Sequence, residues 1–433
     1  MQRSIIAPAE RVTNLRWGIA LLLGIGILVN YFDRVNLTVA GPSLRTEFGI
    51  NDIGFGYLLS AFGWTYAIAQ IPVGIVLDRY GVKIVGRVST FFWSIFSLLT
   101  AAIGSFGMLF GARLGLGLAE TPAFPINSKA TGYWFPTNER GVATAIFDSA
   151  AKLSTAIGVP FVTVIMVNYG WRATFLVTGV VSFLFFVAFY VFYRNPSEDK
   201  RLTHAEREYI KNGGAQPEGV PTTGSVGGTF VYLLKQTKVW GLTIGFAAYG
   251  YSFYLLLTWL PGYLVKTFHM SLLSSGEYTA IPWLVAAVAD LAVGGFLVDA
   301  LIKRGYNPTH VRKTILVCGM LLGLSIFGAT TTRDPNVAII YITIALAGLA
   351  VSAPIGWSIP ALIAPQGAVG TVGSIMNFAN NIMSIIAPIV AGYVVASTGS
   401  FTNVFIIAAA VLVVGILSYV FLLGNIEPIP EPT

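Results

Sequence analysis

The sequence predicts an all-α membrane protein with twelve transmembrane helices in two six-helix bundles. Composition is the first reason: hydrophobic residues fill 55% of the 433 positions and charged residues only 10%. A soluble core cannot bury that much apolar surface. The second reason is a series of apolar runs, each close to the ~20 residues that cross a bilayer. The third is one polar stretch that divides the runs six and six.

Six runs precede the polar stretch. The first starts too late after Arg3, and is too long, for a cleaved secretory signal. In the fourth run Pro122 and Pro125 follow Glu120, which predicts a kinked helix. The six lie near residues 17–40, 53–77, 84–103, 106–128, 143–167 and 173–193.

The polar stretch, residues 195–238, is expected to link an N-terminal bundle (1–194) to a C-terminal one (239–433). Thr203 and Glu206 have capping-box spacing, and Gly213 stands where a helix would stop, so a short surface helix is predicted. A solvated connector is favoured over a regulatory partner site. Residues 213–228 have the composition of a flexible linker.

Six further runs follow, near residues 240–265, 277–300, 314–329, 337–363, 369–396 and 404–423. The second run of each half ends alike. Gly74 leads to Asp78 and Arg79 in the first half, and Gly295 leads to Asp299 and further basic residues in the second. Such a parallel repeat indicates two bundles related by an axis along the membrane normal.

Lysine and arginine predict the orientation, because basic loops stay in the cytoplasm. With both termini inside, about 18 of them fall in cytoplasmic segments and four on the other side, namely Arg45, Arg172, Lys266 and Arg333. This distribution accounts for the net charge of +7, so no nucleic-acid partner is expected. The single Cys318 excludes an internal disulfide. The three histidines lack ligand spacing, so no metal site is expected.

The chain resembles the major facilitator superfamily over essentially its whole length. The loop after the second run carries the family's signature. The residues are Gly74-Ile-Val-Leu-Asp78-Arg79-Tyr-Gly-Val-Lys83. The resemblance implies a gate on the cytoplasmic side, with Asp78 and Arg79 bridging to neighbouring helices near Arg140, and Asp299 as the counterpart in the second half. The alternative is a turn whose charges only orient the protein.

Charged residues inside the apolar runs are costly in a bilayer and indicate function. Asn30, Asp33, Arg34, Leu37 and Thr38 form one mostly polar face of the first run, which should face the protein interior. The others are Arg113, Glu120, Asp148, Lys152 and Asp290. Arg113 and Glu120 are seven residues apart, so they project from the same helix face. A structural ion pair between the first and fourth runs remains an alternative.

Three segments together resemble the anion:cation symporter family, which includes bacterial sugar-acid:proton symporters. They are Asn30-Tyr-Phe-Asp33-Arg34-Val-Asn36, the stretch from Gly111 through Arg113 and Glu120 to Pro125, and Thr258-Trp-Leu-Pro261. The resemblance implies proton-coupled uptake of an organic anion.

A guanidinium suits a carboxylate substrate, so Arg34 is the first expected contact. Arg113 is expected to pair with Asp33 or Glu120, or to be a second anion contact, while Asp33 turns toward the fourth run. Asp33 and Glu120 occupy the family's positions for proton coupling. The resemblance also places Tyr66 and Asn377 at the substrate site. Further candidates are Gln70, Tyr251, Tyr254, Trp357, Ser358, Asn380 and Asn381.

Asp148 and Lys152, at i and i+4, depart from the resemblance. They fit a self-neutralised ion pair, or Lys152 is a second cationic anchor for substrate. Asp290 has no basic partner in its own run. It could pair with Lys152, bind a proton or face a wet cavity.

The expected function is proton symport of an organic anion, most of all a sugar acid, across the bacterial inner membrane. Alternatives are an uncoupled facilitator or exchanger, uptake of an aromatic acid or dicarboxylate, a drug/proton antiporter, and a receptor. No catalytic constellation is present, so an enzyme is not expected. The expected partners are the anion, protons and lipid, with no cofactor, and the chain is expected to act as a monomer.

Overall fold

The computed structural model describes residues 13–136, 139–218, 226–365 and 368–430, without the side chains of a few helical positions that include Asp78 and Asp299. Over this part of the chain every regular element is a helix, as the composition predicted. Nine of the described helices are long and apolar enough to cross a membrane.

Five helices precede the linker and are called the first half. Two of them, with 49 and 53 residues, would be ~75–80 Å long if straight, more than twice a bilayer core. Each turns at a glycine with positive φ, Gly81 (φ 76°) or Gly170 (φ 81°), where a side chain would be strained. Each therefore contains two predicted runs. The helices are α1 (Leu15–Phe48), α2 (Asp52–Thr100), α3 (Phe106–Glu120), α4 (Ala123–Trp134) and α5 (Arg140–Phe192).

The predicted kink in the fourth run is confirmed. α3 ends at Glu120 and α4 begins at Ala123, with Pro122 at the break. Proline cannot donate the backbone hydrogen bond that would continue the helix, so the chain changes direction just after the buried Glu120.

The helices after the linker are called the second half. Its second membrane segment is irregular, because η1 is a π-helix that begins at Asp290. The elements are α8 (Thr237–Phe268), α9 (Leu272–Ala289), η1 (Asp290–Leu297), α10 (Val298–Lys303), α11 (Pro308–Gly323), η2 (Leu324–Thr330), α12 (Pro335–Ile363), α13 (Val369–Thr398), α14 (Thr402–Leu417) and η3 (Ser418–Leu422).

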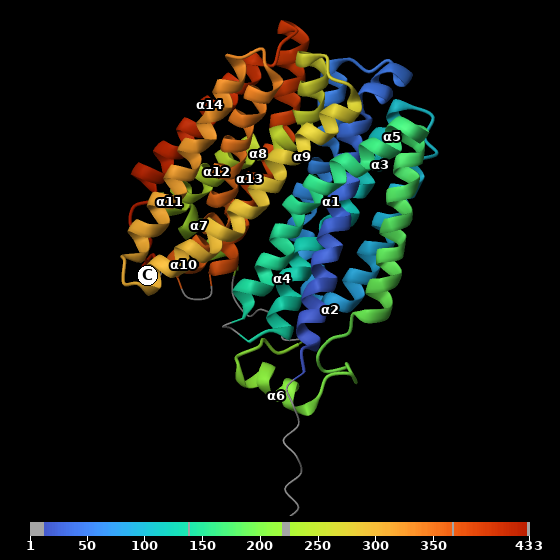
Figure 1. Cartoon of the computed structure of the whole chain (residues 1–433). Coiled ribbons are helices and arrows are strands. Elements are labelled where there is room, and N and C mark those ends of the chain that lie inside the picture. The colour runs from blue at the N-terminus through green and yellow to red at the C-terminus, as the bar shows by residue number, and fades with distance from the viewer. Residues whose placement is uncertain (1–12, 137–138, 219–225, 366–367, 431–433) are drawn as a thin grey trace, which may run out of the picture.

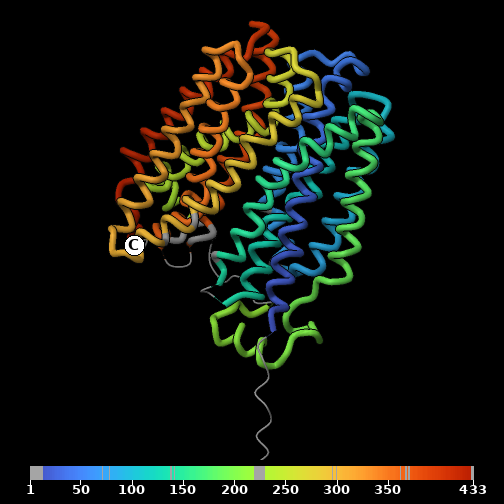
Figure 2. Tube along the Cα trace, viewed as in Figure 1, coloured from blue at the N-terminus to red at the C-terminus, as the bar shows by residue number. Residues whose placement is uncertain are grey.

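The two halves lie side by side and approach each other most closely at the end away from α6 (Figure 1). At that end Lys266 pairs with Asp52 at 3.1 Å. The Tyr57 and Tyr393 hydroxyls are 3.3 Å apart. A Cβ on Gly56 of α2 would lie 2.6 Å from the carbonyl oxygen of Pro388 on α13, so only glycine permits this approach. The end near α6 is called the linker end, and there the two traces diverge (Figure 2).

The linker contains the predicted helix, α6 (His204–Asn212), whose first turn is capped by Thr203. It is more than a solvated connector, because the side chain of Glu206 is fully buried. Glu206 accepts hydrogen bonds from the backbone N–H groups of Leu15 and Arg16 at the start of α1. A second linker helix, α7 (Val226–Leu234), was not predicted. Glu206 thus joins α6 to the first half.

An ionic network surrounds this contact outside the apolar segments. Arg16 binds Glu139 at 2.7 Å and Glu206 at 2.9 Å. Tyr209 of α6 also donates to Glu139 at 2.8 Å. The Arg16 guanidinium, helped by the Tyr209 hydroxyl, holds the pKa of the Glu139 carboxyl below its usual range.

Candidate functional site

The polar face of α1 is buried, as predicted. Asn30, Asp33 and Thr38 are at most 4% exposed, and Arg34 is 9% exposed. Arg113 and Glu120 on α3 are equally buried. Asp33, Arg34, Arg113 and Glu120 are called the arginine cluster.

Arg34 is the centre of this cluster. Its Nε lies 3.2 Å from a carboxylate oxygen of Glu120, which joins α1 to α3. Three aromatic rings surround the guanidinium, those of Tyr31, Phe62 and Tyr66, with centroids 4.7, 4.5 and 5.1 Å from its carbon. Cation–π attraction and the ion pair together hold a charge that would otherwise be costly to bury.

Asp33 turns away from Arg34. Its carboxylate accepts hydrogen bonds from the Trp93 indole at 2.5 Å, from the Ser182 hydroxyl at 2.6 Å and from the Ser97 hydroxyl. The expectation that Asp33 faces the fourth run is therefore wrong. Adjacent residues on a helix point ~100° apart, and this angle aims Asp33 at the later parts of α2 and α5.

Arg113 lacks the predicted acidic partner. No carboxylate of the described residues lies within 4 Å of its guanidinium, so the pairing with Asp33 or Glu120 is corrected. Arg113 instead donates to the backbone carbonyl of Asp33 at 3.2 Å and lies 5.6 Å from the Phe62 ring.

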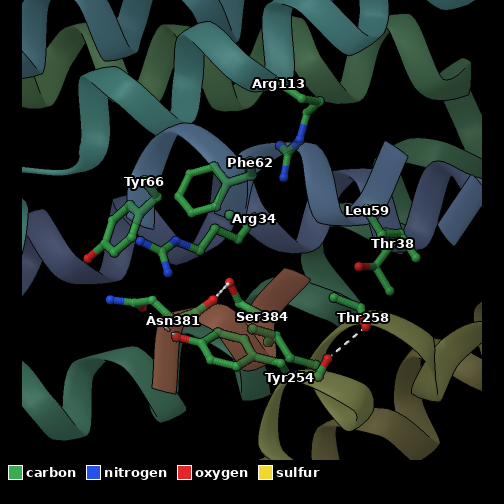
Figure 3. Close-up of a pocket in the computed structure, with 12 residues that line it drawn as sticks. Arg34, Thr38, Leu59, Phe62, Tyr66, Arg113, Tyr254, Thr258, Asn381 and Ser384 are labelled. Atoms are coloured by element: carbon green, nitrogen blue, oxygen red, sulfur yellow. Dashed lines mark hydrogen bonds between the residues drawn. The ribbon is translucent and has the colours of Figure 1, made fainter. Parts of the chain in front are cut away.

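A pocket joins this cluster to the second half (Figure 3). Both arginines line it, and Arg34 lies between Tyr66 and Phe62 on one side and Tyr254 and Asn381 on the other. The complete lining is Arg34, Thr38, Leu59, Phe62, Gly63, Tyr66, Arg113, Tyr254, Leu257, Thr258, Asn381 and Ser384.

Several polar atoms around the pocket have no hydrogen-bond partner. They are Nη2 of Arg34, Nε of Arg113, Oε1 of Glu120 and Nδ2 of Asn381. Buried polar groups are normally paired, so a cluster of unpaired donors indicates room for a ligand with acceptor atoms. Two cationic donors favour an anion. The hydroxyls of Thr258 and Ser384 donate to backbone carbonyls of their own helices and can still accept from a ligand.

Sequence reasoning found part of this lining. Arg34, Arg113, Tyr66, Tyr254 and Asn381 were named as candidates, and all five line the pocket. The apolar Leu59, Phe62, Gly63 and Leu257, with Ser384, were missed as lining residues because nothing in their local sequence marks them.

Other named residues do not line the pocket. Trp357 is 44% exposed and packs on Phe246 at 5.2 Å, and Ser358 donates to the carbonyl of Ile355. On α13, Asn381 lines the pocket one turn after the named Asn377. Gln70, Tyr251, Lys152 and Asn377 are absent from the lining.

Of the expected gate residues, the structure describes the side chains of Arg79 and Arg140 only, and these two have separate contacts. Arg79 is exposed and lies 5.5 Å from the Tyr80 ring. Arg140 donates to backbone carbonyls, at 2.8 Å to Gly214 and 3.4 Å to Gly132. The side chains of Asp78 and Asp299 lie outside the described residues.

Lys152 belongs to a different cluster, between the halves. Its ammonium lies 2.9 Å from Asp148 on the same helix and 2.7 Å from Asp290 on η1. Both sequence-based pairings therefore exist at once. With two carboxylates around it, Lys152 is not free to anchor a substrate anion. Asp148, Lys152 and Asp290 are called the lysine triad.

Comparisons with known proteins identify the family of this chain. The chain is 43% identical to the "Uncharacterized transporter YybO" of Bacillus subtilis (strain 168), with 97% of each chain covered. It is 34% identical to the "Probable galactarate/D-glucarate transporter GudP" of the same organism, over 98% of this chain and 95% of that one. The solved structure of a D-xylose-proton symporter matches with a TM-score of 0.72 at 16% identity, covering 96% of this chain and 99% of that one, and so shares the fold. The family model described as the Major Facilitator Superfamily matches residues 23–388. The chain, with its pocket between two helical halves, therefore belongs to the Major Facilitator Superfamily of membrane transporters and is not an enzyme.

Proposed function

We propose that this transporter carries a sugar acid, together with protons, into a bacterial cell by alternating access. The pocket carries the proposal, because Arg34 and Arg113 both line it and each keeps a buried guanidinium nitrogen unpaired. A carboxylate can accept from both guanidinium groups. Thr38, Tyr66 and Asn381 add groups that can bind the hydroxyls of a sugar chain.

The names of relatives support the substrate class. The "Probable galactarate/D-glucarate transporter GudP" named above is 34% identical to this chain over the aligned residues. Galactarate and glucarate are polyhydroxylated acids, which a pocket with two arginines, an amide and several hydroxyls is suited to bind.

Asp33 and Glu120 are the proposed proton-binding groups. The ion pair of Glu120 with Arg34 competes with substrate for the same guanidinium. Protonation of Glu120 removes that competitor and frees Arg34 for the anion. Asp33 has only neutral side-chain donors around it among the described residues, so a proton there changes the charge of the site without breaking an ion pair.

The proposal includes twelve transmembrane helices, because α2 and α5 turn at Gly81 and Gly170 and so each cross twice. They form the N-terminal bundle (1–194) and the C-terminal bundle (239–433), joined by the linker (195–238). The excess of basic residues at the linker end favours a cytoplasmic position for both termini. Since the described polar contacts between the halves lie away from that end or at mid-depth, this conformation faces the cytoplasm.

The test uses purified protein in vesicles. D-Glucarate accumulation driven by a proton gradient should be lost in Asp33→Asn and in Glu120→Gln, while counterflow exchange without a gradient persists. Glu47→Gln is the matched control, since it removes an exposed carboxylate of α1. Unchanged gradient-driven uptake in both variants would overturn proton coupling and favour a facilitator.

The substrate class has its own test. Thermal stabilisation is measured with galactarate, D-glucarate, D-galactonate, a hexuronate and an aromatic acid. We expect the largest stabilisation from one of the sugar acids. Stabilisation by the aromatic acid alone, or only by amines or neutral sugars, would contradict the assignment.

A further inference from the structure

The lysine triad joins the two halves inside the protein. Lys152 and Asp290 are at most 4% exposed, and the Asp148 side chain is 24% exposed. Asp148 and Lys152 both stand on α5, so their pairing survives any rigid movement of the first half. The bond from Lys152 to Asp290 crosses to the second half. Of the two ion pairs in the triad, movement of one half against the other acts only on this one.

Among the described residues, no second cation lies within 4 Å of the carboxylates of Asp148 or Asp290. Tyr31 of α1 and Tyr249 of α8 are titratable side chains that interact with it electrostatically, and both are neutral donors rather than cations. α12 packs against η1 and has no acidic or basic residue in its sequence. On the elements that flank Asp290 along the chain, Glu277 of α9 and Lys303 of α10 are exposed.

The triad has two carboxylates and one ammonium, so its formal charge is −1 while all three groups are ionised. If Asp290 leaves Lys152, the pair that remains on α5 is neutral and Asp290 is alone. A lone carboxylate in a membrane protein interior is far more costly than a paired one. Taking up one proton removes that cost.

The backbone at Asp290 is suited to such a change. η1 begins at this residue, and π-helical turns are wider than α-helical ones and are frequent at functional sites. A Cβ on Gly294, one turn further on, would lie 2.4 Å from Pro354 of α12. The segment carrying Asp290 therefore sits close to α12 while its own helix is irregular.

We propose that Asp290 takes up one proton each time it leaves Lys152, so that the lysine triad is a proton-binding site separate from Asp33 and Glu120. The inference rests on the proposed function, since it adds one proton to each transport cycle. It links that proton to the relative movement of the halves, whereas Glu120 links its proton to substrate.

The test measures the number of protons moved per D-glucarate, from the membrane potential at which net flux stops in vesicles with a set pH gradient. Asp290→Asn leaves a neutral pair in every state, so the number should fall by one. Asp148→Asn should also lower the number by one. In that variant the separation leaves both Lys152 and Asp290 unpaired, and a proton passing from the ammonium to the carboxylate neutralises both without uptake from solution. Combining both substitutions with Lys152→Gln should lower it by one and no more.

These variants separate a proton site from a structural ion pair. A structural pair predicts changes in rate or stability with an unchanged proton number, and that result in Asp290→Asn would overturn the inference. The neutral triple variant gives the same readout if a single variant fails to fold, because it leaves no unpaired charge. Glu47→Gln again serves as the control with an unchanged number.

The two proposals fail differently. If wild-type vesicles show no proton-linked flux, both proposals are overturned. If wild-type protein couples protons to uptake and the Asp290→Asn number equals the wild-type number, only the role of the triad is overturned.

Discussion

The arginine cluster and the lysine triad solve the same problem, charges buried among apolar helices, in different ways. The arginine cluster lies within the first half and keeps two guanidinium donors and one carboxylate oxygen without a partner. In the triad, no polar side-chain atom of the described structure is both buried and unpaired. An incompletely paired cluster leaves bonds for a ligand, while a completely paired one between two halves holds those halves together. Pairing, more than charge alone, distinguishes a binding site from a contact.

Breaking the triad should give the largest effect on stability. Lys152→Gln leaves two carboxylates without their shared cation, and removing one partner of a buried ion pair costs about 3–5 kcal/mol. Thermal unfolding in detergent measures the loss. Adding Asp148→Asn and Asp290→Asn should restore most of the stability. A single variant as stable as wild type would contradict the account of the triad as a completely paired cluster.

The second-largest effect is expected from replacing the guanidinium of Arg34 by an ammonium group. Arg34→Lys keeps the charge and loses the planar, potentially bidentate donor, so the uptake rate should fall about 100-fold, equivalent to ~2.7 kcal/mol. Arg45→Lys, at the end of the same helix and outside the pocket, is the control. Uptake by Arg34→Lys within a few-fold of the control would show that the pocket needs only a positive charge.

The uncharged contact between Gly56 and Pro388 tests whether close packing of the halves matters for transport as well as ion pairing. Gly56→Ala would place a methyl group 2.6 Å from the Pro388 carbonyl oxygen, so the halves could no longer approach as closely. We expect the uptake rate to fall about tenfold, or ~1.4 kcal/mol. Gly107→Ala on α3 is the control, because a Cβ there meets no atom within 4 Å. Equal rates in the two variants would argue against a role for this contact.

The ionic network around Arg16, which lies outside the apolar segments, should give the smallest effect on stability. It serves as a reference for the two buried clusters, because its carboxylate Glu139 is partly exposed to water. Arg16 and Tyr209 hold the pKa of Glu139 below its unfolded value. Its stabilisation is therefore present above the unfolded pKa, ~4.3, and is lost as the pH falls through the folded value. Thermal unfolding between pH 3 and pH 7 should show a steeper acid loss in wild type than in Glu139→Gln. Parallel profiles would contradict this pairing.

The sequence allowed the apolar runs, the buried polar face of α1, the kink at Pro122 and the cap at Thr203 to be predicted, because each depends on residues close together in the chain. The partners of the buried charges could not be predicted. Asp33 binds Ser182, 149 residues away, and any of several buried donors would have satisfied the same pattern.

The pocket lining shows the same limit. On α12 nearly every residue is apolar, so its sequence has no periodicity that says which side faces the protein, and Trp357 was assigned to the wrong face. On α13 the asparagines at 377, 380 and 381 are all plausible from sequence, and only the helix position selects Asn381. The apolar Phe62 lines the pocket because it packs against Arg34, which no local motif indicates.

The burial of Glu206 also provides a means of observing this protein at work. Because Glu206, and the hydrogen bond from Gln216 to Gly132, join the start of the linker to the first half, a dye on the exposed Lys211 of α6 would report where that half is. A second dye on the exposed Lys303 of α10 would report the other half. The chain has one cysteine, the exposed Cys318, so a single replacement clears the background for thiol labelling. Energy transfer between the dyes would then follow the opening of single molecules in real time.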